Sequence, residues 1–315
     1  MAAGSAITTI LAITPLVCRA QSAPKTAAPA EASASAAQRG IDLAAKGQCT
    51  EALPILKRAA VRPSDKQLKY RAGMATAKCA MSLGQVETAV QALFALRREF
   101  PKDPEVLYIS THYFSELASR TSQELAAEAP TSYQAHELEA EAFESQGRWA
   151  EAAAEYQKIL EQNGNAPGIH FRLGRVALSR GESEANTAEA KKEFEHELKI
   201  DPTNAAAEFS LGEIARRAGQ WDEAITHFSA AGRLDSGFAE AFLALGMSLT
   251  SAQRFADAVA PLEKYVKLVP EDPAGHYQLA IAYDRTGRKE SAARELQLQR
   301  ETAAKAPASA TVAPH

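Results

Sequence analysis

The sequence predicts an all-α fold built from a stack of helical hairpins. Alanine, glutamate, arginine and lysine are abundant and valine and isoleucine are scarce, a composition that favours helix over strand. Aromatic residues make up only 7% of the 315 residues, so much of the core must consist of alanine and leucine. The third observation is a spacing of small and large apolar residues that recurs along the chain, as expected of a repeat protein.

This spacing is clearest in the segment GQWDEAITHFSAAGRL, residues 219–234. After Gly219 come a small residue five positions later, a large apolar residue nine positions later, and a small or apolar residue twelve positions later. These are Ala224, Phe228 and Ala231. The same spacing follows Gly47, Gly84, Gly147 and Gly287, follows Gln253 in place of a glycine, and follows Gly181 after a slip of four residues.

A helical hairpin explains this spacing. Another small residue stands seven positions before each turn, and Gly212, Gly246 and Ala280 are 34 residues apart each time. The turn glycine ends the first helix in a conformation that other residues resist. The small residues mark places where two helices approach closely, and a larger side chain would push the helices apart there. Packing therefore accounts for the repeated residues without a chemical role.

These residues resemble the tetratricopeptide repeat family, most clearly over residues 205–303. The resemblance implies about eight stacked hairpins that form a right-handed superhelical solenoid with a concave inner surface. We expect an insertion near residues 182–189. Residues 104–132 lack the glycine and alanine signature, and we expect a divergent repeat there, helical with a shortened second half. The residues that match the family pattern best are Leu211, Gly212, Gly219, Trp221, Ala224, Phe228 and Ala231.

The two ends of the chain differ from the repeats. Residues 6–17 are an apolar run that is too short to span a bilayer, and small residues flank a cleavage point after Ala20. We therefore predict a secretory signal over residues 1–20, although no basic residue precedes the run; the alternative is a disordered apolar tail. We expect a disordered Ala/Pro/Ser linker over 21–35, the solenoid over 36–303 and a disordered tail over 304–315.

The sequence contains no catalytic pattern. The net charge of −4 offers no basic face for nucleic acid. The histidines occur about once per repeat without a zinc-binding HExxH helix, and the chain lacks both a GxSxG nucleophile turn and a phosphate-binding GxxxxGK[ST] loop. We therefore predict no enzymatic activity, no cofactor, no metal site and no transmembrane anchor.

Cys49 and Cys79 are the two cysteines that remain if Cys18 leaves with the signal. In stacked hairpins they fall at the start of one helix and near the end of its antiparallel neighbour. A disulfide between them is one interpretation, since the cell envelope is oxidising. Two small buried thiols in a helical core are the other.

The resemblance places a ligand on the concave face, which the first helix of each repeat lines. We expect an apolar strip edged by charged residues to bind a peptide there, with ordinary packing as the alternative. The acidic residues Glu137, Glu141 and Glu144 would make the N-terminal half of this face negative. The predicted binding residues are Phe171, Arg175, Phe209, Glu213, Arg216, Leu243, Met247, Tyr277, Ile281 and Arg285.

Together these observations predict a non-enzymatic scaffold of the bacterial cell envelope, periplasmic or secreted, that binds another protein or a peptide. Two alternatives stay open. One is a cytoplasmic repeat adaptor, and the other is an accessory subunit of an enzyme complex for envelope or polysaccharide assembly. The sequence leaves the identity of the partner and the oligomeric state undetermined.

Overall fold

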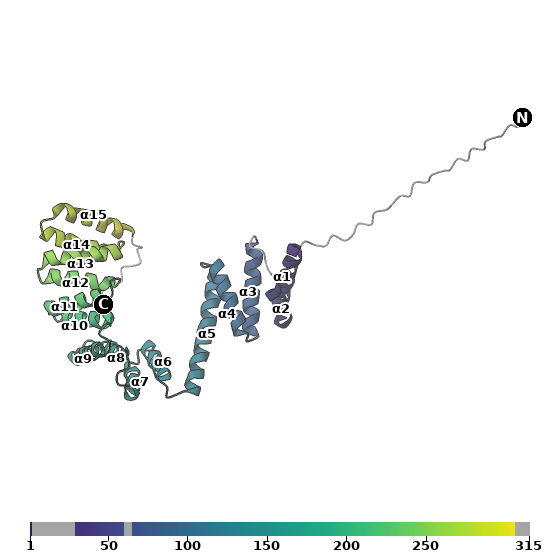
Figure 1. Ribbon diagram of the computed structural model, residues 1–315, viewed down its shortest axis with the longest axis horizontal. Coiled ribbons are helices and arrows are strands. Elements are labelled where there is room, and N and C mark those ends of the chain that lie inside the picture. The colour runs from purple at the N-terminus through teal and green to yellow at the C-terminus, as the bar shows by residue number, and fades with distance from the viewer. Residues whose placement is uncertain (2–28, 60–64, 306–315) are drawn as a thin grey trace. The chain divides into compact units, whose positions relative to one another are not determined.

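The chain is helical throughout the part that the structure describes. The structure, a computed structural model, describes Met1 and residues 29–59 and 65–305 (Figure 1). Within these residues every regular element is an α-helix, so the predicted all-α fold is confirmed. The helices are α1 Pro29–Ala45, α2 Cys49–Arg58, α3 Lys66–Ser82, α4 Val86–Glu99, α5 Pro104–Glu128, α6 Tyr133–Ser145, α7 Trp149–Gln162, α8 Ile169–Ser179, α9 Glu184–Ile200, α10 Ala205–Arg217, α11 Trp221–Leu234, α12 Ala239–Ser251, α13 Phe255–Leu268, α14 Pro273–Arg285 and α15 Lys289–Lys305.

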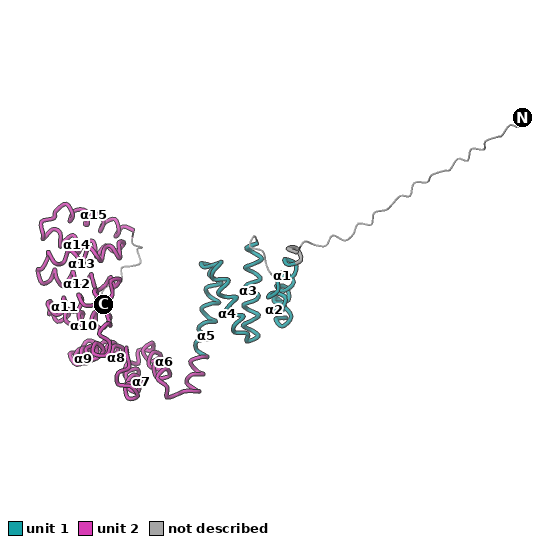
Figure 2. Tube along the Cα trace, viewed as in Figure 1, with its two compact units in different colours: residues 1–120 teal, residues 121–315 magenta. Residues whose placement is uncertain are grey.

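The helices pair into successive hairpins, as expected of a solenoid. Hairpins α1–α2 and α3–α4 precede α5, and α6–α7, α8–α9, α10–α11, α12–α13 and α14–α15 follow it. The chain divides into two compact units, residues 1–120 and residues 121–315, with the division inside α5 (Figure 2). The second unit contains the five hairpins from α6 to α15, and each packs on the next.

The hairpin turns depend on one left-handed residue. Gly219 lies between α10 and α11 with φ of +71°, and glycines occupy the corresponding place in most other hairpins. Glycine adopts this conformation without the steric cost that a Cβ would add. In the turn between α12 and α13 the residue is Gln253, with φ of +58°. The repeat geometry is therefore kept even where the glycine is missing.

The small residues of the first helices lie against large residues of the second helices. A Cβ built on Gly212 would lie 2.6 Å from Cε1 of Phe228, and one built on Gly246 would lie 2.4 Å from Cγ of Leu262. Phe228 and Leu262 are fully buried. The sequence spacing thus records real helix contacts, and these contacts form the core inside each hairpin.

The third repeat differs from the prediction. We expected a helix with a shortened second half over residues 104–132, but α5 is one continuous helix of 25 residues. No glycine or proline occurs between Pro104 and Pro130, so nothing in this segment ends the helix before the second proline. The described part of the chain therefore has seven hairpins and a single helix, instead of about eight hairpins.

The boundaries of the folded region also differ slightly. Helix α1 begins at Pro29, so the last residues of the expected linker are helical. Proline is well tolerated at the first helical position, and the alanines that follow favour helix. At the other end α15 runs to Lys305, just into the expected tail. The slip after Gly181 corresponds to a second helix, α9, that is 17 residues long.

Several predicted segments fall outside the described residues. These are residues 2–20 of the expected signal, residues 21–28 of the linker and residues 306–315 of the tail. None of the helices described by the structure has the length and hydropathy that a bilayer span needs.

Candidate functional site

The first helices α10, α12 and α14 lie on the inner side of the second unit. Within this unit α10 contacts α12, and α12 contacts α14, although a second helix separates each pair in the sequence. No pair of second helices makes a comparable contact among the described residues. A stack in which only the first helices approach one another is concave on that side. This face carries the predicted binding residues.

The aromatic residues of the predicted strip are not equivalent. The ring of Phe171 lies 5.6 Å from the buried Phe194, measured between centroids. Phe209 packs against both Phe228, at 5.4 Å, and Phe238, at 4.9 Å. Phe171 and Phe209 are therefore largely packing residues. Tyr277 differs because 49% of it is exposed and it contacts no ring of another described residue.

The aliphatic residues of the strip neither pack as ring pairs like Phe171 and Phe209 nor are as exposed as Tyr277. Leu243, Met247 and Ile281 are half-buried on α12 and α14. Leu243 also packs against the cluster around Leu262 and Leu279, within the last hairpins. Incompletely buried apolar residues of the strip therefore lie on both α12 and α14; they are Leu243, Met247, Tyr277 and Ile281.

The charged residues at the edge are partly neutralised within the protein. Arg216 donates two hydrogen bonds to Glu213, of 3.0 and 2.8 Å. The guanidinium of Arg285 stacks over the ring of Phe255 at 4.3 Å. Arg175 is freer, since its side chain is 54% exposed and its nearest carboxylate, that of Glu144, is 3.9 Å away.

The acidic half of the face, which we expected to be negative, is partly neutralised by arginines. Arg172 of α8 forms ion pairs with Glu137, at 3.3 Å, and Glu141, at 2.7 Å, both on α6. Glu144 accepts a hydrogen bond of 2.6 Å from the hydroxyl of Tyr156. Burial and this hydrogen bond raise the pKa of Tyr156, so Tyr156 remains a donor. Arg172, whose contacts were not evident from the sequence, balances part of this negative charge.

A histidine–glutamate pair joins the two helices of most hairpins in the second unit. In three hairpins the histidine Nδ1 of the first helix lies 2.6 to 2.8 Å from a carboxylate of the second helix. In α10–α11 the order is reversed, and Glu208 of the first helix pairs with His227 of the second at 2.7 Å. The other pairs are His136–Glu155, His170–Glu193 and His276–Glu295.

The pair occupies one fixed place in the repeat, which the sequence analysis did not detect. Its members are 19 residues apart, or 23 in the hairpin with the four-residue slip. In hairpin α3–α4 the two places hold Gly73 and Ala92, which are also 19 residues apart. These small residues line a hollow of about 250 Å³ between α2, α3 and α4 of the first unit.

The last pair is the most constrained. Both ring nitrogens of His276 face acceptors, with Glu295 at 2.6 Å and the Pro270 carbonyl at 3.0 Å. Because a carboxylate and a carbonyl only accept hydrogen bonds, this geometry favours the imidazolium, which donates from both nitrogens. Burial lowers the pKa of His276, but the bonds to Glu295 and Pro270 outweigh it and the net shift is upward.

Glu197 explains an irregularity in the repeat pattern. It stands where most other second helices have an apolar or small residue, and it is fully buried. Its carboxylate accepts hydrogen bonds from the backbone amides of Gly168, at 2.8 Å, and Phe171, at 3.2 Å. Helix α9 thus supplies the acceptor for free amides at the start of α8. Its role is structural.

Two groups of side chains offer metal-ligand atoms, although the sequence predicted no metal site. One comprises His170, Glu193 and His196, and the other comprises His136, Glu139 and Glu155. Neither group was evident from the sequence, because the ligands of each come from two helices and only some of them follow a short spacing.

The structure joins the two cysteines. Cys49, the first residue of α2, forms a disulfide with Cys79 of α3, and their Cα atoms are 4.9 Å apart. The bond links the first hairpin to the second within the first unit. Cys79 is buried in the core that these helices share.

Comparison with known proteins identifies the repeats. Two sequence profiles, both described as tetratricopeptide repeat, match this chain. One matches residues 43–111, and the other matches residues 116–168, 138–186, 183–237 and 243–308. Among curated proteins, no sequence matches.

Solved structures of similar arrangement include MamA and YrrB. A MamA structure is 21% identical, covers 53% of this chain and 95% of its own, and has a TM-score of 0.48. MamA from Desulfovibrio magneticus RS-1 is 18% identical, with coverages of 55% and 95% and a TM-score of 0.48. YrrB, described as a TPR protein with an unusual peptide-binding site, is 20% identical, with coverages of 57% and 91% and a TM-score of 0.49.

Proposed function

Because the chain belongs to the tetratricopeptide repeat family, we propose that it is a non-enzymatic scaffold that binds another protein or a peptide. The proposed site is the concave face of the second unit. One observation carries the proposal: successive first helices present incompletely buried apolar side chains at corresponding places. These are Leu243 and Met247 on α12, and Tyr277 and Ile281 on α14.

The charged residues on the other first helices of this unit define the partner further. Arg216 and Arg172 are already paired with carboxylates of the protein, so they have little charge left to offer. Arg175 is exposed and weakly paired, and a carboxylate of the partner can form a charge-assisted hydrogen bond with it. We therefore propose a peptide with apolar side chains and at least one acidic residue, bound in an extended or helical form.

Photo-crosslinking tests this site in the native cell. A photoreactive phenylalanine analogue at position 277 should crosslink to a partner. The same group at Lys267, an exposed residue of the second helix α13, serves as the matched control. Crosslinking at 267 but not at 277 would place the partner on another surface. The variant Tyr277→Ser should then weaken capture, whereas Phe209 is a poor choice because its ring supports the core.

We also propose that the protein is exported to the cell envelope. The apolar run at residues 6–17 and the disulfide between Cys49 and Cys79 support this location. Intact-mass measurement on fractionated native cells, without reductant, tests it. A disulfide-bonded protein lacking residues 1–20 supports export, whereas a full-length reduced protein supports the cytoplasmic adaptor. Co-purification of an enzyme would favour the accessory-subunit alternative.

A further inference from the structure

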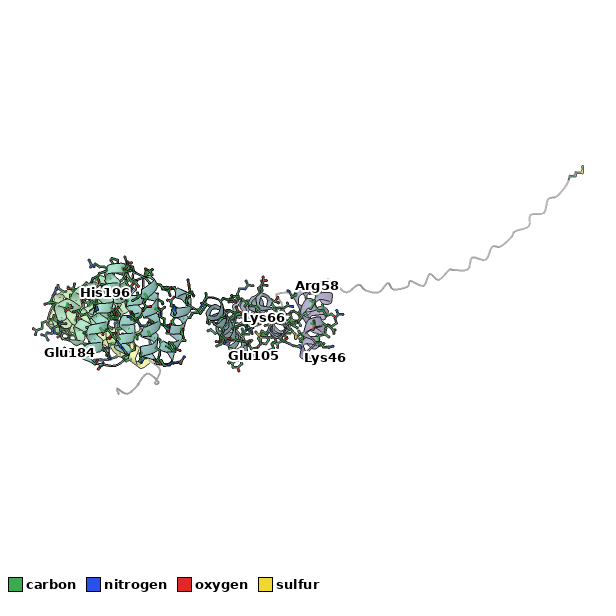
Figure 3. The ribbon with its side chains drawn as sticks, turned by 90° about the horizontal axis from the view of Figure 1, so that it is seen from below. Lys46, Arg58, Lys66, Glu105, Glu184 and His196 are labelled. Carbon is green, nitrogen blue, oxygen red and sulfur yellow. A yellow bond between two sulfur atoms is a disulfide. The ribbon has the colours of Figure 1, made fainter. Side chains whose placement is uncertain are left out.

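We propose that His170, Glu193 and His196 bind a zinc ion between α8 and α9. Each residue offers one ligand atom, and these atoms all lie within 4.8 Å of one another. Two imidazole nitrogens and a carboxylate oxygen form a donor set that suits zinc, with a fourth position left for water. The site lies in the second unit, where Figure 3 labels His196.

The three side chains lie nearly as close together as the ligands of one zinc ion would. His170 Nδ1 is 2.6 Å from Glu193 Oε2, and the rings of His170 and His196 meet edge to face with centroids 5.2 Å apart. Tetrahedral zinc with bonds of about 2.0–2.1 Å places ligand atoms about 3.4 Å apart. Glu193 and His196 are three residues apart on α9 and so share one face. Rotations about side-chain bonds can widen the contact between His170 and Glu193 and bring all three ligand atoms to this spacing.

Comparison with the pair of hairpin α6–α7 shows how this site differs from it. In hairpin α6–α7 the residue at the repeat position of His196 is Lys158, and its ammonium lies 2.5 Å from Glu155 Oε1. A lysine thus supplies the positive charge beside that carboxylate. Glu193 has no lysine or arginine within ion-pair distance among the described residues, and a histidine replaces the lysine. Glu208 and Glu295 likewise have no lysine or arginine within this distance among the described residues, so the third ligand, His196, is what distinguishes this hairpin from those two. A zinc ion would supply a positive charge beside Glu193.

No hydrogen bond within the described residues accounts for a histidine at position 196. It is half-buried and makes no hydrogen bond to any other described residue, so its ring nitrogens remain available to a ligand. The side chains of His170 and Glu193 are only 12% and 15% exposed, so the ion would be largely shielded from water. The second group, around His136, is less suitable because Lys158 already neutralises Glu155 and Glu139 is exposed.

The consequence is a metal clip between the two helices of one hairpin. This hairpin is the one in which the repeat spacing slips by four residues after Gly181. Binding would fix α9 against α8 near Glu197, which already holds the start of α8. The open coordination position could be filled by water or by a side chain of a partner protein.

Metal titration of the full chain tests the proposal. The protein is prepared metal-free and without a histidine tag, with the Cys49–Cys79 bond oxidised and Cys18→Ser in all samples so that no free thiol contributes. Calorimetric titration with zinc should show one ion per chain at micromolar or tighter affinity. Cobalt should give visible ligand-field bands that zinc then removes.

Variants show whether the named residues bind the ion. His196→Ala should weaken zinc binding by roughly tenfold or more and abolish the cobalt bands. His227→Ala is the matched control, because it removes the histidine of an equivalent pair that has no third ligand, and it should leave binding unchanged. Circular dichroism confirms that each variant is folded. The proposal is overturned if the parent protein binds no zinc, if His196→Ala binds equally well, or if His227→Ala loses the same affinity.

Discussion

The ring of Phe228 lies against the backbone of Gly212, close enough that a Cβ on the glycine would be 2.6 Å from Cε1. Replacing a glycine inside a helix by alanine normally stabilises the helix by roughly 1 kcal/mol. At Gly212 the close contact with Phe228 reverses this effect, so that alanine destabilises the protein. We expect Gly212→Ala to lower the free energy of unfolding by about 1–3 kcal/mol in urea denaturation, because Phe228 must move within a packed core.

Gly232 provides a control in which the added Cβ would meet a looser contact. A Cβ there would lie 2.9 Å from Cε1 of Phe242, which is half-buried and freer to move. Gly232→Ala should therefore cost less than Gly212→Ala. Equal stabilisation by both substitutions would show that the predicted helix contact is absent.

Gln253 holds a left-handed conformation that favours glycine. Its φ is +58°, whereas the preceding hairpin has Gly219 with φ of +71°. A residue with a Cβ pays roughly 1–2 kcal/mol for this conformation. Gln253→Gly should raise the free energy of unfolding by about 1 kcal/mol, and Gly219→Gln should lower it by a similar amount. Thermal and urea denaturation of both variants measure the difference, and a loss of stability in Gln253→Gly would contradict the argument.

His276 should make stability depend on pH. Its folded-state pKa is raised above the ordinary value of 6.5, so its ionic contact with Glu295 contributes fully below pH 6.5. The contribution is lost as the pH rises through the folded pKa. We expect His276→Gln to lose roughly 1.5–3 kcal/mol at pH 6, as for a hydrogen bond to a charged group. Urea denaturation from pH 6 to 9 should show this difference shrinking, and a difference that grows with pH would contradict the assignment.

The disulfide should stabilise the first unit. Cys49 and Cys79 are separated by 30 residues, and closing a loop of this size typically contributes about 2–4 kcal/mol. Reduction should lower the free energy of unfolding of the first unit by that order. The double variant Cys49→Ser with Cys79→Ser should start at the lower value and show no response to reductant. A parent protein that is equally stable with and without reductant would argue against the bond.

The repeat spacing made the hairpins predictable because it follows from contacts inside each hairpin. Gly212 lies against Phe228, and Phe228 shares a core cluster with Ala224. The same residue types return at the corresponding places of other hairpins. The single helix α5 was harder to predict. It depends on the absence of a helix breaker between Pro104 and Pro130, and no repeated residue signals such an absence.

The candidate site was predicted less completely because its residues depend on contacts between repeats. Phe209 seemed open to a ligand, but Phe238 from the following turn covers part of its ring. The negative charge of Glu137 and Glu141 was visible in the sequence, whereas its partial neutralisation by Arg172 depends on the placing of α8 beside α6. The histidine–glutamate spacing is present in the sequence, but the reversed order of Glu208 and His227 obscures it.

That reversed pair has a consequence for how the chain assembles. Repeats of similar sequence can join the wrong halves during folding, as when the first helix of one hairpin docks on the second helix of another. Docking α10 on α7 or α15 would bring Glu208 against Glu155 or Glu295, two carboxylates at one poorly solvated place. Docking α6 or α14 on α11 would bring two histidines together. The exchange of one acid and one base therefore disfavours mismatched halves, and marks α10 and α11 as partners for each other.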